Sequence, residues 1–384
     1  MCACRSASSI STTFWPIWNR RWRRPAARPR PPEPSPPRAR AAASFPDISA
    51  PRQGGCDQRM LAMTLTRRLF LAATAALALA TSPALAEPLR EIRIDWATYN
   101  PLSLLIREKG LLEREFEKDG IAITWVQSAG SNKALEFLNA GSLDFGSSAG
   151  SAALLARING NPIRSVYSYS RPEWTALVTR ADSGIASVAD LKGRTVAVTR
   201  GTDPHVFLVR ALAEAGLSQD DVRVVLLQHA DGRTALIRGD VDAWAGLDPI
   251  MTSAEVEDGA VLFHRDPAAN TWGILNVREA FLQENPAIVE RVLKVYEAAR
   301  HEAVADPAGL KRIVAGVTGL PAAVVDRQLD ERTDLSQPRI GSAQRESILR
   351  AGAALQAAGV IEAAVDVPAT VDALLDDRLP AATN

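Results

Sequence analysis

A nine-residue sequence motif occurs twice in this chain in similar form, and it constrains the fold more than any other feature. The first copy, LNAGSLDFG, runs from Leu138 to Gly146, and the second, LIRGDVDAW, runs from Leu236 to Trp244. Each copy is typical of a helix end, a glycine stop, and a strand that opens with an aliphatic residue and an aspartate. The glycines Gly141 and Gly239 lie 98 positions apart. That spacing is too long for a solenoid and favours two similar α/β lobes.

An export signal is predicted at residues 63–86. Arg67 and Arg68 precede an apolar run, Leu69–Ala80, and Ala84-Leu85-Ala86 follows it. A positively charged segment, a short apolar run and small residues before the cleavage site form the pattern of such signals. The apolar run is too short to span a bilayer as a helix. We expect cleavage after Ala86 and a periplasmic location. The stretch 66–71 resembles a twin-arginine signal, and the general secretory route stays open.

Upstream of this signal, residues 1–62 are rich in arginine and proline. Such a composition cannot bury a core. An export signal works from the N-terminus, so we expect the true start at Met60 or Met63 and regard residues 1–62 as a non-native or disordered extension. The alternative is a basic arm for nucleic acid or a membrane.

The charge of the mature chain differs from that of the whole sequence. The 384 residues contain 44 basic and 44 acidic side chains, of which residues 1–86 hold 13 and 3. The remainder is therefore acidic, which disfavours nucleic acid as a partner. All three cysteines, Cys2, Cys4 and Cys56, precede residue 87. We therefore expect neither disulfides nor a cysteine metal site, and no cofactor.

Strand and helix patterns alternate along residues 91–246, which predicts an α/β fold with mostly parallel sheets flanked by helices. The C-terminal part from Asn285 onward is mostly helical. We expect a first lobe from residues 87–170 and 270–384, and a second lobe from residues 171–269. The expected strands are 91–96, 121–126, 143–145, 163–169, 175–179 and 195–199, and the expected helices are 101–109, 132–139, 152–158, 206–215, 286–306, 310–315, 321–329 and 343–358.

An ordered set of short motifs then suggests a family. The set comprises SVADLKGRTVAV at 187–198, which reads as a capped turn followed by a strand, the two copies of the nine-residue motif, and Asp248-Pro249. It resembles periplasmic solute-binding proteins of the aliphatic sulfonate, taurine and nitrate group. The resemblance implies a two-lobed, type II-like binding protein with its ligand in the cleft, which serves an ATP-driven (ABC) importer through an inner-membrane permease. It also implies sulfur uptake as the role, and we expect a monomer.

Five strand-to-helix turns could hold an anionic head group, because helix N-termini present unpaired N–H groups and a partial positive charge. Ser147, Ser148 and Asn100 are the preferred hydrogen-bond donors, with Arg171 or Arg200 supplying charge. Trp174 and Trp244 are expected to line the tail, although each is also a candidate core residue. Asp203 before Pro204 departs from the family and would compete for the N–H groups. The full predicted set is Tyr99, Asn100, Ser128, Gly130, Ser131, Ser147, Ser148, Arg171, Trp174, Arg200, Gly201, Thr202, His205, Trp244 and Asp248.

Several alternatives remain open. Gly146-Ser147-Ser148-Ala149-Gly150 matches the nucleophile elbow of serine hydrolases, but no oxyanion-hole glycine motif precedes it. The same fold group includes binders of thiamine-pyrimidine precursors and enzymes of thiamine synthesis. Nitrate, taurine, a sulfate ester or a carboxylate would need similar donors. We therefore expect a non-enzymatic binder of a small organic anion, with an aliphatic sulfonate as the leading ligand.

Overall fold

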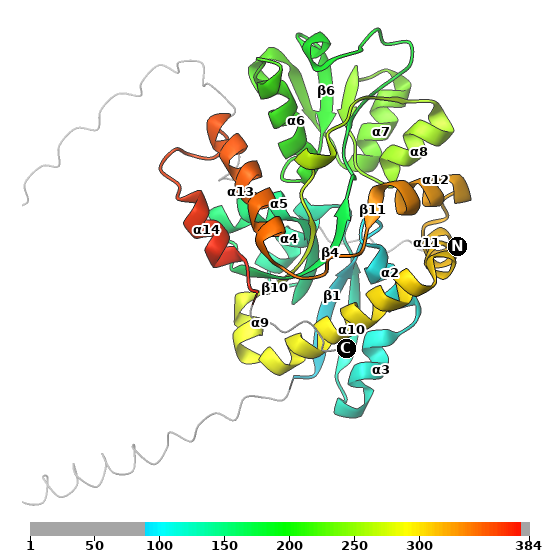
Figure 1. The fold of residues 1–384 in the computed structure, drawn as a ribbon, viewed down its shortest axis with the longest axis vertical. Helices are drawn as coiled ribbons and strands as arrows, with labels where there is room; N and C mark the ends of the chain where they lie inside the picture. Colours follow the sequence, from blue (N-terminus) through cyan, green and yellow to red (C-terminus); the bar gives the residue numbers. More distant parts are fainter. Residues whose placement is uncertain (1–88, 378–384) are drawn as a thin grey trace, which may run out of the picture. The chain divides into compact units, whose positions relative to one another are not determined.

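Two β-sheets, one of six strands and one of five, form the framework of the protein (Figure 1). The computed structural model describes residues 89–377, so the predicted export signal and the extension before it lie outside the described residues. Two segments connect the sheets, one between Pro172 and Leu177 and one between His264 and Gly273. We refer to the six-stranded sheet with its helices as lobe 1, and to the five-stranded sheet with its helices as lobe 2. The lobe limits predicted from the sequence stay a prediction.

The sheet of lobe 1 is mixed. Its strand order is β11 (Thr333–Asp334), β4 (Ile163–Pro172), β10 (Gly273–Arg278), β3 (Phe145–Ala149), β1 (Glu91–Trp96) and β2 (Ala122–Gln127). Strands β2, β1 and β3 are parallel, whereas β10 is antiparallel to both β3 and β4. The sheet is therefore mixed rather than parallel throughout, because β10, on which the chain returns from lobe 2, lies between β3 and β4 and is antiparallel to both.

The sheet of lobe 2 follows the same plan. Its order is β7 (Arg223–Leu226), β6 (Thr195–Val198), β8 (Ala243–Ala245), β5 (Leu177–Thr179) and β9 (Val261–His264). Strands β7, β6 and β8 are parallel, and β5 is antiparallel to β8 and β9. Each lobe therefore has a parallel half made by local strand–helix units and an antiparallel half made where the chain enters or leaves.

The repeated nine-residue motif has the same structural role in both lobes. Gly141 and Gly239 end their helices with positive φ angles of 69° and 81°, which glycine adopts without steric cost. Oδ2 of Asp144 then accepts from the backbone N–H of Arg93 at 2.9 Å, and Oδ2 of Asp242 accepts from that of Thr195 at 2.8 Å. In each lobe the aspartate thus fastens the new strand to its parallel neighbour.

The helices pack on both sheets, and some helices of lobe 1 also contact helices of lobe 2. Lobe 2 carries α6 (Asp203–Glu214), α7 (His229–Arg238) and α8 (Ile250–Asp258). The long helix α10 (Pro286–Ala305) packs on α2 (Pro101–Glu108) and contacts β4 in lobe 1. Helices α12 (Ala322–Asp326) and α13 (Ser342–Ala357) contact α8 and α6 of lobe 2, respectively. The remaining helices are α3 (Leu111–Phe116), α4 (Ser131–Asn139), α5 (Gly150–Ile158), α9 (Glu279–Glu284), α11 (Pro307–Thr318) and α14 (Val367–Leu374), with a π-helical turn at Arg327–Glu331.

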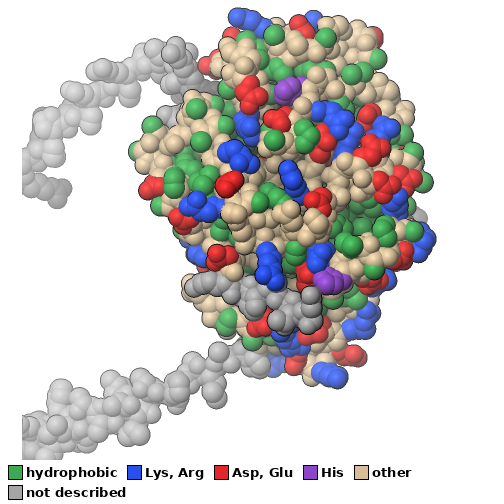
Figure 2. Space-filling model, in the orientation of Figure 1, with side chains coloured by type: hydrophobic (Ala, Val, Ile, Leu, Met, Phe, Trp, Pro, Cys, Tyr) green, Lys and Arg blue, Asp and Glu red, His purple; other side chains and the backbone are tan. Residues whose placement is uncertain are grey.

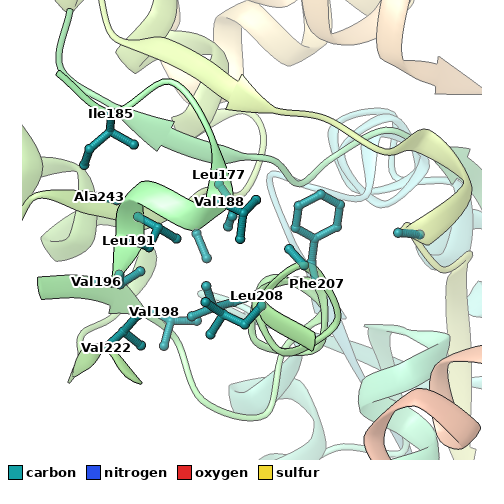
Figure 3. Packing of buried hydrophobic residues seen from close by; sticks show 14 residues of the cluster. Leu177, Ile185, Val188, Leu191, Val196, Val198, Phe207, Leu208, Val222 and Ala243 are labelled. Carbon is teal, nitrogen blue, oxygen red and sulfur yellow. The ribbon is translucent and has the colours of Figure 1, made fainter. Parts of the chain in front are cut away.

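Each face of the lobe 2 sheet has its own hydrophobic core. Phe207 and Leu208 of α6 pack with Leu191 and Val196 on one face, as Figure 3 shows. Trp244 is fully buried on the opposite face, among residues that include Leu236 and Met251. Burial of such side chains contributes roughly 1.5–3 kcal/mol each, so these two clusters help to hold α6 and α7 on the lobe 2 sheet.

Charged side chains of both signs are interspersed on the face shown in Figure 2. Many of them are paired, as in the contact of Arg233 with Asp258 at 2.7 Å. Among residues 89–377, no helix combines the length and the apolar character that a membrane span requires. In the same residues, no group of three or more histidine, cysteine or acidic side chains has an arrangement suited to a metal ion.

Candidate functional site

A small pocket lies where the two lobes and the segments between them meet. Its lining comes from both sides of the cleft, with Tyr99 and Ser170 from lobe 1, Asp248 from lobe 2, and Trp174 from the connecting segment. Pro172, Gln328, Arg332 and Thr333 complete it. The cavity measures about 10 Å³, which is room for about one water molecule. An organic anion therefore requires the lobes to separate before it can enter.

Arg332 is the buried cation of this pocket, and it follows the π-helical turn of the C-terminal segment. Its side chain is only 2% exposed. One amino group, Nη1, donates to the hydroxyl of Thr252 at 2.7 Å, and Nη2 donates to Glu255 at 2.7 Å. Its Nε has no hydrogen-bond partner among the described residues. The Nε–H group is therefore a donor that an oxyanion could use, although Asp248 and Glu255 already lie beside the guanidinium charge.

Asp248 faces Arg332 from the N-terminal end of α8. Its Oδ1 accepts from the N–H and the hydroxyl of Thr252 at 2.9 and 2.7 Å, and its Oδ2 lies 3.5 Å from Nη1 of Arg332. Burial raises the pKa of Asp248 to about 6, although Arg332 and Thr252 act in the opposite direction. Asp248 therefore holds the C-terminal segment of lobe 1 against α8 of lobe 2.

The apolar wall of the pocket is a pair of aromatic rings. Tyr99 and Trp174 meet edge to face, with ring centroids 6.1 Å apart. Both side chains are buried, and the Trp174 indole N–H donates to Asp203 at 2.8 Å. Aromatic pairs of this kind give a rigid apolar surface with a fixed polar edge, which suits a short aliphatic tail.

A polar cluster lies behind Tyr99 in lobe 1. Asp95 accepts from both the backbone N–H and the hydroxyl of Ser147 at 2.9 Å, and Asn100 donates to the same hydroxyl at 2.8 Å. Burial raises the pKa of Asp95 to about 6, while the hydrogen bonds from Ser147 lower it. The cluster fixes the start of α2 and with it the position of the Tyr99 ring.

Comparison with known proteins decides the family. The NMT1/THI5-like family model matches residues 113–309, which is 197 of 384 residues. The chain belongs to the NMT1/THI5-like family. A relative from Escherichia coli K12, named "Putative aliphatic sulfonates-binding protein", is 31% identical over 238 residues, which cover 60% of this chain and 72% of the relative.

Solved structures of two sulfonate-binding proteins have a similar fold. The alkanesulfonate-binding protein SsuA from Xanthomonas axonopodis pv. citri, bound to MOPS, is 28% identical with a TM-score of 0.68, covering 74% of this chain and 99% of that one. The periplasmic aliphatic sulphonate-binding protein SsuA from Escherichia coli is 27% identical with a TM-score of 0.62, covering 72% and 90%. An enzyme, 4-amino-5-hydroxymethyl-2-methylpyrimidine phosphate synthase from Aspergillus parasiticus, is also related, at 24% identity over 57% of this chain and 68% of the enzyme. The two-lobed fold expected from the sequence is confirmed.

In this NMT1/THI5-like chain, three of the predicted site residues line the pocket: Tyr99, Trp174 and Asp248. Asn100 and Ser147 belong to the polar cluster behind it. Ser148 lies on β3 rather than in a turn, because the strand continues to Ala149 and the helix begins at Gly150. Its hydroxyl accepts from Asn276 at 2.8 Å and donates to the carbonyl of Ala149. The serine of the elbow motif is therefore fully buried inside a sheet.

The second predicted turn brings lobe 1 against lobe 2. A Cβ atom at Gly130 would lie 3.0 Å from Nε2 of His229 on α7, so the lobes approach closely there. Burial lowers the pKa of His229 to about 3. Ser131 accepts from the N–H of Ala149 at 3.0 Å, and Ser128 is buried beside the Asp95 carboxylate.

The predicted residues of the fourth turn are Arg200, Gly201, Thr202 and His205, and Thr202 and His205 make contacts within lobe 2. Thr202 donates to the carbonyl of Thr199 at 2.7 Å, and Gly201 takes a φ of 75° in the turn before α6. Nε2 of His205 lies 3.3 Å from Oε1 of Gln219, and burial lowers the pKa of His205 to about 4. Burial also lowers the pKa of Arg200.

Arg171 and Trp244, two of the predicted residues outside the pocket lining, have other surroundings. Arg171 is exposed, and its guanidinium lies 5.7 Å from the centre of the Trp272 ring. Trp244 faces away from the cleft, and its indole packs on Gly232, where a Cβ atom would lie 2.5 Å from Nε1. The tail role predicted for Trp244 is corrected accordingly, since alternate residues of β8 face the two cores and this one faces the α7 side.

The sequence reasoning missed Arg332, Gln328 and Thr333. All three belong to the C-terminal segment, which was expected only to pack back on a lobe. The pattern RQLDERTD at 327–334 carries many charges and predicts an exposed helix face. Only the return of this segment to the cleft buries Arg332, so no local signal could have identified it.

Proposed function

We propose that this protein is the substrate-binding component of an ABC importer and that it captures a small organic sulfonate between its lobes. The observation that carries the proposal is the pocket itself. Both lobes supply its walls, a buried guanidinium stands at one side, and an aromatic pair forms another. This combination suits a ligand with an oxyanion at one end and a short apolar tail.

Relatives support the choice of ligand class, since the Escherichia coli relative and the two SsuA structures are named as binding proteins for aliphatic sulfonates or alkanesulfonates. By the same argument, we place the protein in the periplasm as a monomer that delivers its ligand to an inner-membrane permease for sulfur uptake. Nitrate, taurine and thiamine-pyrimidine precursors are the competing ligands.

We further propose that the ligand leaves chemically unchanged. Ser148, at the centre of the elbow motif, contacts Asn276 and a backbone carbonyl. A serine nucleophile needs an adjacent base within hydrogen-bond reach, and neither of these partners is one.

A thermal-shift screen of residues 87–384 tests the proposal. The ligands are ethanesulfonate, taurine, sulfate, nitrate and acetate at equal ionic strength. A ligand that binds the folded state raises the midpoint, and the stabilisation grows with the logarithm of its concentration over its dissociation constant. We expect the largest rise with a sulfonate. A larger rise with nitrate or acetate, or no rise with any of them, would overturn the sulfonate assignment.

A further inference from the structure

Asp203 is a buried carboxylate that binds four hydrogen-bond donors. It is the first residue of α6 in lobe 2 and is 2% exposed. Its Oδ1 accepts from the hydroxyls of Ser151 and Thr271 at 2.5 and 2.7 Å, and its Oδ2 accepts from the N–H of Thr271 and the indole of Trp174 at 2.9 and 2.8 Å. Each of these donors is neutral.

These donors lie on three separate parts of the protein. Ser151 is in the first turn of α5 in lobe 1. Trp174 lies in the segment that leads from β4 to β5, and Thr271 lies in the segment that leads from β9 back to β10. One carboxylate of lobe 2 therefore joins lobe 1 and both connecting segments at once. We call this arrangement the Asp203 contact.

The donor set of the Asp203 contact matches what an oxyanion requires. Two hydroxyls, a backbone N–H and an indole N–H converge at the N-terminus of a nine-residue helix, where the peptide dipoles favour negative charge. An ionised carboxylate and a sulfonate are both acceptor-only groups with at least two oxygens. Trp174 also lines the pocket, so the donor set borders the space assigned to the ligand.

Asp203 accepts more hydrogen bonds than its place at a helix N-terminus requires. Asp231 holds a comparable position in the first turn of α7 and is exposed. An acidic side chain there is enough to interact with the helix dipole. All four donors to Asp203, in contrast, come from outside its own helix. The position of Asp203 is therefore explained by its partners across the cleft.

We propose that Asp203 is an internal competitor of the ligand, a tethered carboxylate that holds the cleft closed without ligand and must be displaced by an incoming anionic head group. The head group would then bind Ser151, Thr271 and Trp174 in its place. This inference rests on the function proposed above, since it assigns the head-group donors of that same site.

The proposal has a quantitative consequence. If the closed, ligand-free form predominates, the apparent affinity falls by the fraction of molecules that are open. Without the Asp203 carboxylate, a larger fraction of the ligand-free molecules is open. The substitution also removes a negative charge next to the bound anion. We therefore expect Asp203→Asn to bind ethanesulfonate about tenfold more tightly than the natural protein, a change of about 1.4 kcal/mol.

Two measurements on three variants test this. The variants are Asp203→Asn, Ser151→Ala and the matched control Asp231→Asn, each first checked for folding by circular dichroism. Calorimetry with ethanesulfonate gives the affinity, and small-angle scattering without ligand gives the radius of gyration. We expect both Asp203→Asn and Ser151→Ala to open the ligand-free protein, but only Asp203→Asn to bind more tightly. Ser151→Ala should bind more weakly because it lacks a head-group donor, and the control should match the natural protein.

Other outcomes overturn the proposal. If Asp203→Asn binds ethanesulfonate equally or more weakly, the carboxylate is not a competitor. If neither Asp203→Asn nor Ser151→Ala enlarges the ligand-free protein, the contact does not hold the cleft closed. Should the natural protein and Asp203→Asn both fail to bind any sulfonate, the proposed function fails, and the scattering result alone then decides whether Asp203 closes the cleft. If Asp203→Asn does not fold, Asp203→Ser, which also lacks the carboxylate, replaces it in both measurements and is judged by the same outcomes.

Discussion

The guanidinium of Arg332 lies 2.7 Å from the hydroxyl of Thr252, and this hydrogen bond joins the C-terminal segment of lobe 1 to α8 of lobe 2. The same guanidinium faces Asp248 and Glu255. It is thus both a tie between lobes and the cation of the pocket.

Removal of the Arg332 charge should destabilise the protein and abolish anion binding. Arg332→Met leaves the buried Asp248 without its cation, and breaking a buried ion pair in this way costs about 3 kcal/mol. Urea unfolding measures the free energy of unfolding. The matched control is Arg312→Met, which removes the exposed pair with Asp306 and should change stability by less than about 1 kcal/mol. Equal losses in the two variants would contradict a special role for Arg332.

A methyl group at Gly130 should keep the lobes apart. The added Cβ would lie 2.9 Å from Oδ1 of Asn132 and 3.0 Å from Nε2 of the buried His229. Overpacking of this kind costs about 1–3 kcal/mol, so Gly130→Ala should weaken sulfonate binding about tenfold or more in calorimetry. Gly316→Ala is the control, since its Cβ meets nothing within 4 Å. Unchanged affinity in Gly130→Ala would show that the lobes do not close at this point.

The stability of the protein should depend on Asp95 through pH. The pKa of Asp95 is about 6 in the folded protein against an ordinary value of 3.8, so its contribution is greatest below pH 4 and is lost as the pH rises through 6. Asp95→Asn removes this titration. Relative to the natural protein, the variant should gain about 2 kcal/mol between pH 4 and pH 7.5 in urea unfolding. Comparison of the two proteins cancels the other titrating groups, and a constant difference across this range would contradict the prediction.

Ser148 should matter for stability and not for binding. Its hydroxyl accepts from Asn276 inside the lobe 1 sheet, and loss of such a hydrogen bond costs about 1 kcal/mol. Ser148→Ala should therefore lower the free energy of unfolding by that amount and leave the affinity for ethanesulfonate unchanged. A tenfold loss of affinity would return Ser148 to the list of head-group donors.

Local patterns predicted the parallel halves of both sheets and most of the helices. The strand 91–96 was placed at its observed limits, and the glycine stops at Gly141 and Gly239 were correctly identified. These features depend on neighbouring residues, since a glycine with positive φ and an aspartate at the strand entry act within one strand–helix unit. The orientation of β10 depends on where the chain returns from lobe 2, and its own residues carry no sign of it.

The site was only partly predictable for the same reason. Tyr99, Trp174 and Asp248 follow strand ends, a position that sequence patterns reveal. Ser147 and Ser148 looked like turn residues because small polar side chains give no strand signal, yet β3 extends through both. Arg332 reaches the pocket from a segment more than 80 residues beyond Asp248, and only tertiary packing brings the two together.

Titration of the mature chain with ethanesulfonate in a calorimeter tests the central claim most directly. The account predicts saturable binding of one anion per chain, loss of that heat in Arg332→Met, and recovery of ethanesulfonate unchanged after release. Absence of saturable binding to ethanesulfonate and taurine by a folded protein, or conversion of either into a product, would contradict it.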